Sequence, residues 1–233
     1  MDTITFVFDG RTVTVPAGTT LLDAARAAGI EVPVICYHPH FTANALCRIC
    51  VVEIEGSRTL VPACIRRAEP GMVVQSDSER VRRARRTILE LLGSAVDTSE
   101  APEIQAYAAT YGADPGRLGD VPRRTFPLYD DNAFYVRDYS KCILCWRCVQ
   151  ACGEDIQYTF AIEVAGRGFD SRIATFFNRP IPESTCVYCG NCVAACPTGA
   201  LKSKRELWLE LGRSLDELVR QPVRRRRSRD RSP

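Results

Sequence analysis

Two cysteine runs limit what this chain of 233 residues can fold into. Both have the spacing C-x2-C-x2-C-x3-C, and Pro197 follows the second directly. The first run contains Cys142, Cys145, Cys148 and Cys152, and the second contains Cys186, Cys189, Cys192 and Cys196. Three thiolates so close together can wrap one metal centre in a single tight loop. We therefore expect a small unit, residues 129–203, built around two similar metal centres.

The spacing identifies these centres as [4Fe-4S] clusters. It is the run found in bacterial two-cluster ferredoxins, where the fourth cysteine of each run ligates the other cluster. One cluster is accordingly assigned to Cys142, Cys145, Cys148 and Cys196, and the other to Cys186, Cys189, Cys192 and Cys152. Zinc is the alternative because CxxC pairs also bind that ion, but zinc sites usually space their pairs by a dozen or more residues. Two identical runs of four favour iron–sulfur clusters.

Residues 1–78 are predicted to form a separate β-grasp unit. The β-branched stretches ITFVFDG and RTVTVPAG meet at Asp9-Gly10, which is a strong hairpin signal. Thr19 or Thr20 can then cap a helix over LLDAARAAG, which Gly29 ends. A hairpin followed by a helix and a long loop is how a β-grasp fold begins.

That unit carries four further cysteines with the spacing C-x10-C-x2-C-x13-C: Cys36, Cys47, Cys50 and Cys64. Three lie on one long loop, and the fourth follows a short strand-like segment. Four thiolates so placed suit a [2Fe-2S] cluster held against a β-grasp sheet, although the first gap is longer than in plant-type ferredoxins. A four-cysteine zinc site is the alternative.

Residues 79–128 are predicted to be a helical linker. ERVRRARRTILELL has the periodicity of an amphipathic helix, with Arg80, Arg82, Arg83, Arg85 and Arg86 on or around its polar side. These arginines either form a solvated face or pair with a cluster-bearing or partner surface. Glycines and prolines in residues 112–122 indicate a loop. In the later unit, residues 158–164 and 171–177 are expected to form a hairpin over the clusters.

Residues 204–233 are predicted to form a helix followed by an arginine-rich tail. The last eleven residues contain six arginines and one aspartate, whereas the whole chain has a net charge of only +3. We interpret the tail as a solubilising segment. The alternatives are that it docks to an acidic subunit, or that it contacts nucleic acid or an anionic membrane. Nucleic acid is the weaker choice because the run has no interleaved aromatic residues.

Composition and the N-terminus bear on location and chemistry. The chain opens on a strand-like segment without a basic region followed by an apolar one, and it has no run of about 20 apolar residues for a membrane span. Twelve cysteines without a secretory signal are expected to remain thiols in a reducing cytoplasm. No nucleotide-binding fingerprint or Ser–His–Asp pattern is present. Because these catalytic and nucleotide-binding patterns are missing, we expect the chain to have a non-catalytic role.

Four residues near the cysteines have alternative interpretations. His38 and His40 are interpreted as supporting or surface residues because four cysteines already complete the nearby site, and the alternative is metal ligation or proton transfer. Trp146 and Tyr188 are expected to pack over the clusters and exclude water. The alternative is that they relay electrons.

Three segments carry a resemblance to a known family. VPVICYHPHF, NALCRICVVEIEG and LVPACIRRAEPGMVVQSDSERVRRARRTILELL resemble the N-terminal region of the large iron–sulfur subunit of complex I. The same region is found in NAD-linked, molybdenum-dependent formate dehydrogenases and in the diaphorase iron–sulfur subunit of NAD-reducing hydrogenases. Downstream, DYSKCILCWRCVQACGEDIQ, AGRGFDSRIATFF and ESTCVYCGNCVAACPTGALKSK are most similar to the formate dehydrogenase version. The resemblance covers roughly residues 3–210 and implies that the first site holds [2Fe-2S].

The chain departs from this pattern in one segment. The family places a His-x3-Cys-x2-Cys-x5-Cys motif for a further [4Fe-4S] cluster after the ILELL helix. Here LLGSAVDTSEAPEIQAYAATYG follows, without a cysteine or histidine. We therefore expect three clusters, and direct electron transfer from the [2Fe-2S] centre to a [4Fe-4S] centre.

The resemblance implies an α+β electron-transfer subunit of a soluble NAD(P)-linked oxidoreductase. One partner would be a flavoprotein that binds NAD(P), and the other a molybdopterin or nickel–iron catalytic subunit. In formate dehydrogenases a molybdopterin domain follows, whereas this chain ends after RELWLELGRSLDELVR and the tail. The alternative function is a redox sensor whose arginine tail binds nucleic acid. A sensor, however, generally needs one labile, exposed cluster, not three in series.

Overall fold

The computed structural model describes residues 2–214, and the predicted N-terminal hairpin is confirmed. Strands β1 (Thr3–Phe8) and β2 (Arg11–Pro16) pair antiparallel. Asp9 and Gly10 form the turn with φ of 47° and 74°, the left-handed conformation that a tight hairpin requires. Helix α1 (Leu21–Ala27) begins at Thr20, whose side chain accepts a hydrogen bond from the Asp23 amide.

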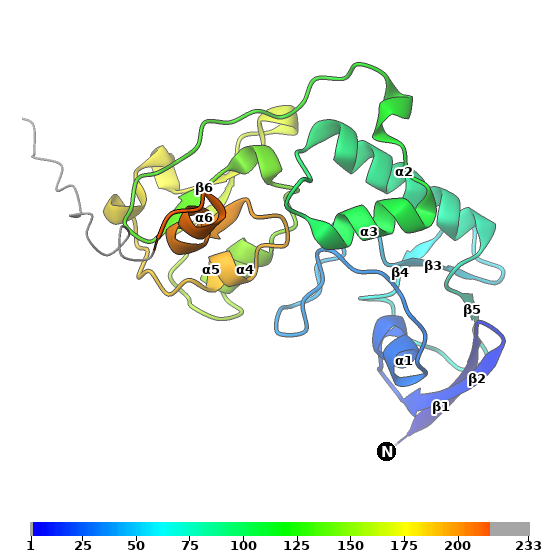
Figure 1. Cartoon of the computed structure of the whole chain (residues 1–233). Helices are drawn as coiled ribbons and strands as arrows, with labels where there is room; N and C mark the ends of the chain where they lie inside the picture. Colours follow the sequence, from blue (N-terminus) through cyan, green and yellow to red (C-terminus); the bar gives the residue numbers. More distant parts are fainter. Residues whose placement is uncertain (1, 215–233) are drawn as a thin grey trace, which may run out of the picture.

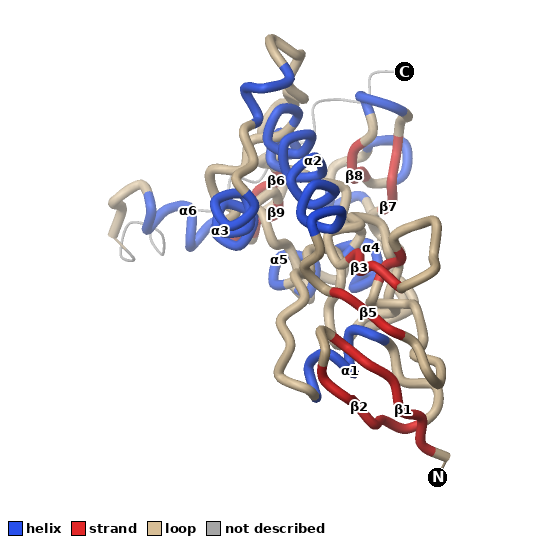
Figure 2. Tube along the Cα trace, turned by 90° about the vertical axis from the view of Figure 1, so that its right-hand side faces the viewer, coloured by secondary structure: helices blue, strands red, loops and turns tan. Residues whose placement is uncertain are grey.

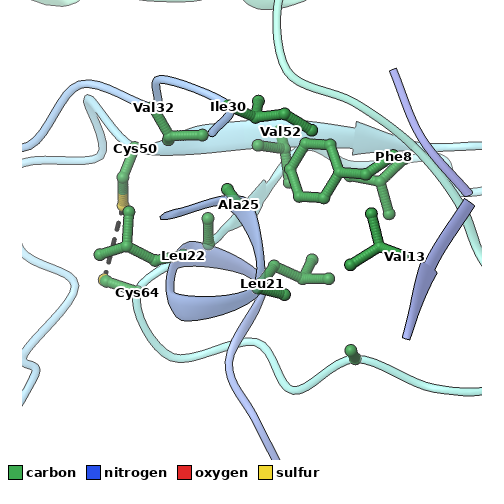
Figure 3. Close-up of a cluster of buried hydrophobic side chains, with 14 of the residues drawn as sticks. Phe8, Val13, Leu21, Leu22, Ala25, Ile30, Val32, Cys50, Val52 and Cys64 are labelled. Atoms are coloured by element: carbon green, nitrogen blue, oxygen red, sulfur yellow. Dashed lines mark hydrogen bonds between the residues drawn. The ribbon is translucent and has the colours of Figure 1, made fainter. Parts of the chain in front are cut away.

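The N-terminal unit is a β-grasp. Its five-stranded sheet has the order β2-β1-β5-β3-β4, with β3 (Val51–Ile54), β4 (Val61–Pro62) and β5 (Val73–Gln75). The central pair, β1 and β5, is parallel, and the other pairs are antiparallel. Helix α1 lies against the sheet and buries Leu21 and Leu22 completely (Figure 3). Cys50 and Cys64 lie at one end of this core.

Two helices follow the β-grasp unit (Figure 1). Helix α2 (Glu79–Ala95) begins at Ser78, whose hydroxyl accepts from the Val81 amide, and α3 (Pro102–Tyr111) ends at a left-handed Gly112. Residues 112–122 form the expected loop, except that they include a 3-10 turn, η1 (Pro115–Leu118), which packs along α2.

The solvated arginine face predicted for α2 is wrong at Arg85. This side chain is 1% exposed and lies beneath the helix, where it donates to the carbonyls of Ile49 and Val51 at 3.0 and 2.9 Å and to the hydroxyl of Tyr111 at 2.7 Å. A buried guanidinium must find several acceptors to offset its lost hydration, and backbone carbonyls supply them here. Arg83 and Arg86 are exposed, as predicted.

The remaining described residues form a second unit with short elements. Strands β6 (Tyr135–Arg137) and β9 (Leu201–Ser203) pair antiparallel, and α4 (Arg147–Cys152) and α5 (Asn191–Ala194) lie within the second halves of the two cysteine runs. Strands β7 (Glu163–Ala165) and β8 (Arg172–Ala174) form the expected hairpin. The hairpin is shorter than predicted because residues 158–162 are irregular, with Tyr158 and Phe160 at positive φ. The β6–β9 pair was not predicted.

Short 3-10 turns complete this unit: η2 (Tyr139–Lys141), η3 (Gly168–Asp170), η4 (Phe176–Asn178) and η5 (Ile181–Glu183). Helix α6 (Lys204–Glu210) begins at Ser203, whose side chain accepts from the Glu206 amide. A helix was predicted over residues 205–220, but α6 ends at Glu210, so residues 211–214 are not helical. Residues 215–220 and the arginine tail lie outside the described residues. Within residues 2–214, no helix is long and apolar enough to cross a membrane.

Helices α2 and α3 connect the two units (Figures 1 and 2). Ile35 and Ile49 from the long cysteine loop share one buried cluster with Leu89 of α2 and Ile104 of α3. Ile143, from the first cysteine run of the second unit, packs on the same cluster. The cysteine loops of both units therefore pack against one hydrophobic cluster.

Candidate iron–sulfur sites

The four cysteines of the N-terminal unit come together at one end of the β-grasp core. The Sγ atoms of Cys50 and Cys64 are 3.4 Å apart (Figure 3). The amides of Cys36 and Cys47 each point at the sulfur of the other, at 3.4 Å. Cys36, Cys50 and Cys64 are buried, and Cys47 is partly exposed. All four predicted ligands thus converge on one place.

The backbone of the long loop is bent to direct amides toward sulfur. Ala45 and Arg48 have φ of 52° and 59°, a conformation that non-glycine residues adopt only when the surroundings enforce it. Without iron, the hydrogen bond from the Cys36 thiol lowers the pKa of Cys47 to about 6. Amides and a readily formed thiolate are the environment that an iron–sulfur cluster needs.

The two later cysteine runs repeat one backbone conformation. In the first, Leu144 and Trp146 have φ of 56° and 70°; at the equivalent positions in the second, Tyr188 and Gly190 have φ of 58° and 79°. The amides of Leu144 and Tyr188 each lie 3.4 Å from the sulfur of the first cysteine in their run. Equal spacing has therefore produced equal loops, each followed by a short helix.

Sulfurs from both runs gather around each centre. A small cavity is lined by Cys142, Cys145 and Cys148 of the first run together with Cys196 of the second. The pKa of Cys192 is raised to about 12, first by burial and then by repulsion from Cys152 of the first run and from Cys186 and Cys189 of the second. The structure thus places Cys196 with the first three cysteines of the first run, and Cys152 near Cys192 of the second run. Which sulfurs share a cluster stays a prediction.

The donor sets fit iron–sulfur clusters chemically. The second unit offers eight thiols around two centres, and its amides of Ala161 and Leu201 lie 3.2 and 3.5 Å from the sulfurs of Cys152 and Cys196. In residues 2–214, no group of three or more His, Cys, Asp or Glu side chains converges closely enough to hold a single metal ion. A cluster of several irons, in contrast, holds its cysteines farther apart than one ion does.

The two centres of the second unit differ in exposure. The four cysteines of the first run are all buried. In the second run Cys189 is exposed, and the other three are partly exposed. The neighbouring side chain of Val187 is 56% exposed. The centre that includes Cys189 therefore lies at the protein surface.

The histidines and aromatic residues near the cysteines have defined surroundings. The ring of His38 stacks on that of Phe41 at 4.4 Å, and its Nδ1 accepts from the His40 amide at 3.3 Å. Trp146 lines the cavity of the first centre, and Tyr188 packs its ring 5.0 Å from that of Phe134. Both residues therefore pack at the cysteine loops, but Trp146 is 40% exposed. That the two side chains exclude water from clusters stays a prediction.

Several residues that support the cysteines had no signal in the sequence. The Tyr135 hydroxyl lies 3.3 Å from the sulfur of Cys186, and burial together with this contact raises the pKa of Tyr135. Arg124 donates to the carbonyl of Cys142 at 2.6 Å from a loop far along the chain. Their positions depend on how distant segments pack, so no local pattern could reveal them.

Comparisons with known proteins match both units. The family model of a 2Fe-2S iron–sulfur cluster binding domain matches residues 1–79, and that of a 4Fe-4S dicluster domain matches residues 141–200. In the solved structure of an NAD+-reducing [NiFe]-hydrogenase in the H2-reduced state, one chain is 30% identical with a TM-score of 0.75. The match covers 86% of this chain and 87% of that one.

The chain belongs to the family of iron–sulfur subunits shared by complex I and NAD-reducing hydrogenases. It is an α+β iron–sulfur protein of the electron-transfer type found in those NAD(P)-linked oxidoreductases. This confirms the resemblance seen in the sequence. The similar proteins are parts of oxidoreductases, so the comparisons give no support to the alternative function as a redox sensor.

Curated relatives of the family are longer than this chain. The NADP-reducing hydrogenase subunit HndD of Solidesulfovibrio fructosivorans is 37% identical over 225 residues, which are 89% of this chain and 37% of that protein. A protein of the NADH-quinone oxidoreductase of Rhizobium meliloti is 34% identical, with 86% of this chain and 24% of that protein covered. The chain thus spans only a quarter to somewhat over a third of these curated relatives.

Proposed function

We propose that this chain relays single electrons between a flavoprotein that binds NAD(P) and a separate catalytic subunit. It would hold one [2Fe-2S] and two [4Fe-4S] clusters, with the twelve cysteines as ligands in the three groups assigned above. When bound, the clusters supply one-electron redox chemistry; the protein's residues fix their positions, exclude water and tune their potentials.

The observation that carries the proposal is the direct contact between the two cysteine-bearing units. The amide and hydroxyl of Thr42 both donate to the Asp155 carboxylate at 2.8 Å. Asn44, on the same loop as Cys47, donates to the carbonyl of Cys145 at 3.3 Å and to the side chain of Gln150 at 3.1 Å. The [2Fe-2S] loop is therefore joined to the loop of the first [4Fe-4S] cluster.

Further contacts make this junction continuous. Arg147, inside the first cysteine run, donates to the carbonyl of Tyr37 at 2.7 Å. Phe41 is buried against Ala151 and Ala195 of the second unit. Packed side chains and hydrogen bonds with no intervening element favour direct transfer from the [2Fe-2S] centre to the first [4Fe-4S] cluster. The second [4Fe-4S] cluster would then be the exit, because Cys189 lies at the surface.

The partners are inferred from what the relatives are named for. One relative belongs to an NADP-reducing hydrogenase, another belongs to an NADH-quinone oxidoreductase, and the solved structure is an NAD+-reducing [NiFe]-hydrogenase. A flavoprotein would pass electrons to or from the [2Fe-2S] side. The opposite partner would carry either nickel–iron or molybdopterin. The similarity of FDSRIATFF and CPTGALKSK to formate dehydrogenases points to the molybdopterin lineage by ancestry, whereas the hydrogenase relatives favour nickel–iron as the present partner.

Cluster content and one variant test the proposal together. Anaerobically purified protein should contain about ten irons and show a [2Fe-2S] signal in electron paramagnetic resonance (EPR) after reduction. Cys64→Ser should abolish NAD(P)-linked electron transfer in the assembled complex, while artificial donors that enter downstream still reduce the catalytic subunit. Ile65→Ser, at the adjacent and 48% exposed residue, is the matched control and should retain both activities.

Two results would contradict the proposal. Stoichiometric zinc in place of iron would overturn the cluster assignment. Retained NAD(P)-linked turnover in a Cys64→Ser protein shown to lack the [2Fe-2S] signal would mean that electrons bypass the N-terminal unit.

A further inference from the structure

Glu100 joins the loop between α2 and α3 to the second unit. This loop, residues 96–101, stands where the resemblance implies a further cluster motif. The Glu100 carboxylate forms ion pairs with the ammonium groups of both Lys141 and Lys202. Lys202 is only 6% exposed and also pairs with Glu210 at 2.7 Å. One carboxylate thus bridges two lysines from separate segments.

Both lysines belong to the immediate surroundings of the first [4Fe-4S] centre. Lys141 directly precedes Cys142. Lys202 directly follows Leu201, whose amide points at the Cys196 sulfur at 3.5 Å. A hollow of about 310 Å³ is lined by Glu100 and Lys202 together with Cys196. The charges of Glu100 and Lys202 therefore lie beside Cys196, and Lys141 ties the same carboxylate to the chain next to Cys142.

Gly199 shows how closely Glu100 packs on the turn after Cys196. Its φ is +69°, and a Cβ added there would lie 3.2 Å from the Glu100 Cβ and would clash with the Glu100 carboxylate. Glycine therefore suits this position for two reasons: the left-handed backbone and the lack of space. The contact fixes the Glu100 side chain against the turn.

The three side chains are held in their charged forms. Burial opposes ionisation of Glu100, but the hydrogen bonds and positive charges of Lys141 and Lys202 outweigh it and lower the pKa of Glu100. Burial likewise opposes the charge of Lys202, yet the carboxylates of Glu100 and Glu210 raise its pKa. Lys141 pairs with the carboxylates of Glu100 and Asp138. At neutral pH, the ammonium groups of Lys141 and Lys202 thus share the Glu100 carboxylate, and each also pairs with a second carboxylate, Asp138 for Lys141 and Glu210 for Lys202. Glu100 is the only one of these three carboxylates that pairs with both lysines.

We propose that Glu100 is a positioning residue that keeps the reduction potential of the first [4Fe-4S] cluster low by neutralising Lys141 and Lys202. Reduction adds a negative charge to the cluster, so nearby ammonium groups favour it and a nearby carboxylate disfavours it. Without Glu100, the two lysines would act on the cluster with less compensation. This inference rests on the proposed ligation of that cluster by Cys142, Cys145, Cys148 and Cys196.

The test is a redox titration of the full, cluster-loaded chain, monitored by EPR. Glu100→Gln keeps the shape of the side chain and removes its charge. We expect the potential of the first cluster to shift to a more positive value, with a smaller shift for the second cluster. Glu103→Gln removes the same charge from an exposed position on α3 and is expected to leave both potentials unchanged. An unchanged potential in Glu100→Gln, or an equal shift in Glu103→Gln, would overturn the proposal.

A second variant separates charge from loosened structure. Lys202→Met removes a positive charge at similar length, so the first cluster should shift to a more negative potential. If Glu100→Gln does not retain its iron, this variant alone decides: a negative shift supports the proposal, and no shift or a positive shift refutes it. Failure of the underlying cluster assignment would be visible separately, as a wild-type iron content far from about ten.

Discussion

Arg85→Met is expected to release the [2Fe-2S] site while both [4Fe-4S] clusters stay in place. Ile49 and Val51, whose carbonyls accept hydrogen bonds from Arg85, are the two neighbours of Cys50 in the chain. The guanidinium also anchors the Tyr111 hydroxyl at the end of α3. Arg85 therefore holds the backbone around one cluster ligand in place from the helix behind it.

The hydrogen bonds indicate a large effect. Hydrogen bonds from charged donors contribute about 1.5–3 kcal/mol each, and Met leaves two buried carbonyls and one hydroxyl without this donor. Packing of the Met side chain returns part of that loss, so the net cost is about 3–5 kcal/mol. The ion pair between Arg85 and Asp77, at 3.7 Å with Asp77 51% exposed, contributes little. In a unit of this size such a loss lowers the melting temperature by more than about 10 °C.

The assay is thermal loss of the [2Fe-2S] EPR signal, measured beside the iron content. Arg85→Met should lose this signal at much lower temperature than wild type, and its iron content should fall toward about eight. Arg83→Met is the matched control on the same helix, because Arg83 is exposed. If Arg85→Met kept its [2Fe-2S] cluster to the same temperature as Arg83→Met, the reasoning would be refuted.

Three further predictions test the site and its supports. Cys196→Ala should damage the first [4Fe-4S] cluster, although this cysteine lies in the second run; spectroscopy showing loss of the second cluster alone would disprove crossed ligation. Asp155→Ala, which removes two hydrogen bonds between the units, should slow electron transfer from the [2Fe-2S] centre in flash-reduction kinetics, whereas the exposed neighbour Glu154→Ala should not. The Arg117 guanidinium holds the pKa of Glu90 below its usual value, so the stabilisation is complete above the unfolded-state pKa and is lost as pH falls through the folded-state pKa. Glu90→Gln should therefore show a flatter decline of melting temperature in acid than wild type, and an identical decline would count against this ion pair.

The parts of the fold that local chemistry determines were predictable. Asp9-Gly10 specifies its hairpin turn, Thr20 caps α1, and the repeated cysteine spacing produces two loops of equal backbone conformation. In each case the residues that carry the signal are also the residues that make the contact. The cysteine spacing likewise predicts sets of sulfurs for common centres, and the ligation of clusters by these sets stays a prediction.

Features that depend on packing between distant segments could not be predicted. Arg85 stands four residues from both Val81 and Leu89, so the helical period places it on the buried face of α2. What the sequence could not show is that Ile49, Val51 and Tyr111, from distant segments, would supply its hydrogen-bond acceptors. Strands β6 and β9 are three residues each and about sixty residues apart, so neither has enough alternation to indicate a strand. The β7–β8 hairpin was predicted too long because Tyr158 and Phe160 favour strands, but both residues adopt positive φ.

The loop between α2 and α3 explains how the two units come to touch. It is short, and its start is held by two hydrogen bonds: the Asp97 amide donates to the carbonyl of Ser140 at 3.1 Å, and the Arg124 amide donates to the carbonyl of Ala95, the last residue of α2, at 2.9 Å. Since Arg124 also binds the carbonyl of Cys142, the end of α2 is tied to the first [4Fe-4S] loop. The same short segment thus ties α2 to the loop of Cys142 and delivers Glu100 to Lys141 and Lys202. Under the proposed function, the segment would therefore influence both the packing of the two cysteine-bearing units and the charge beside the first [4Fe-4S] cluster.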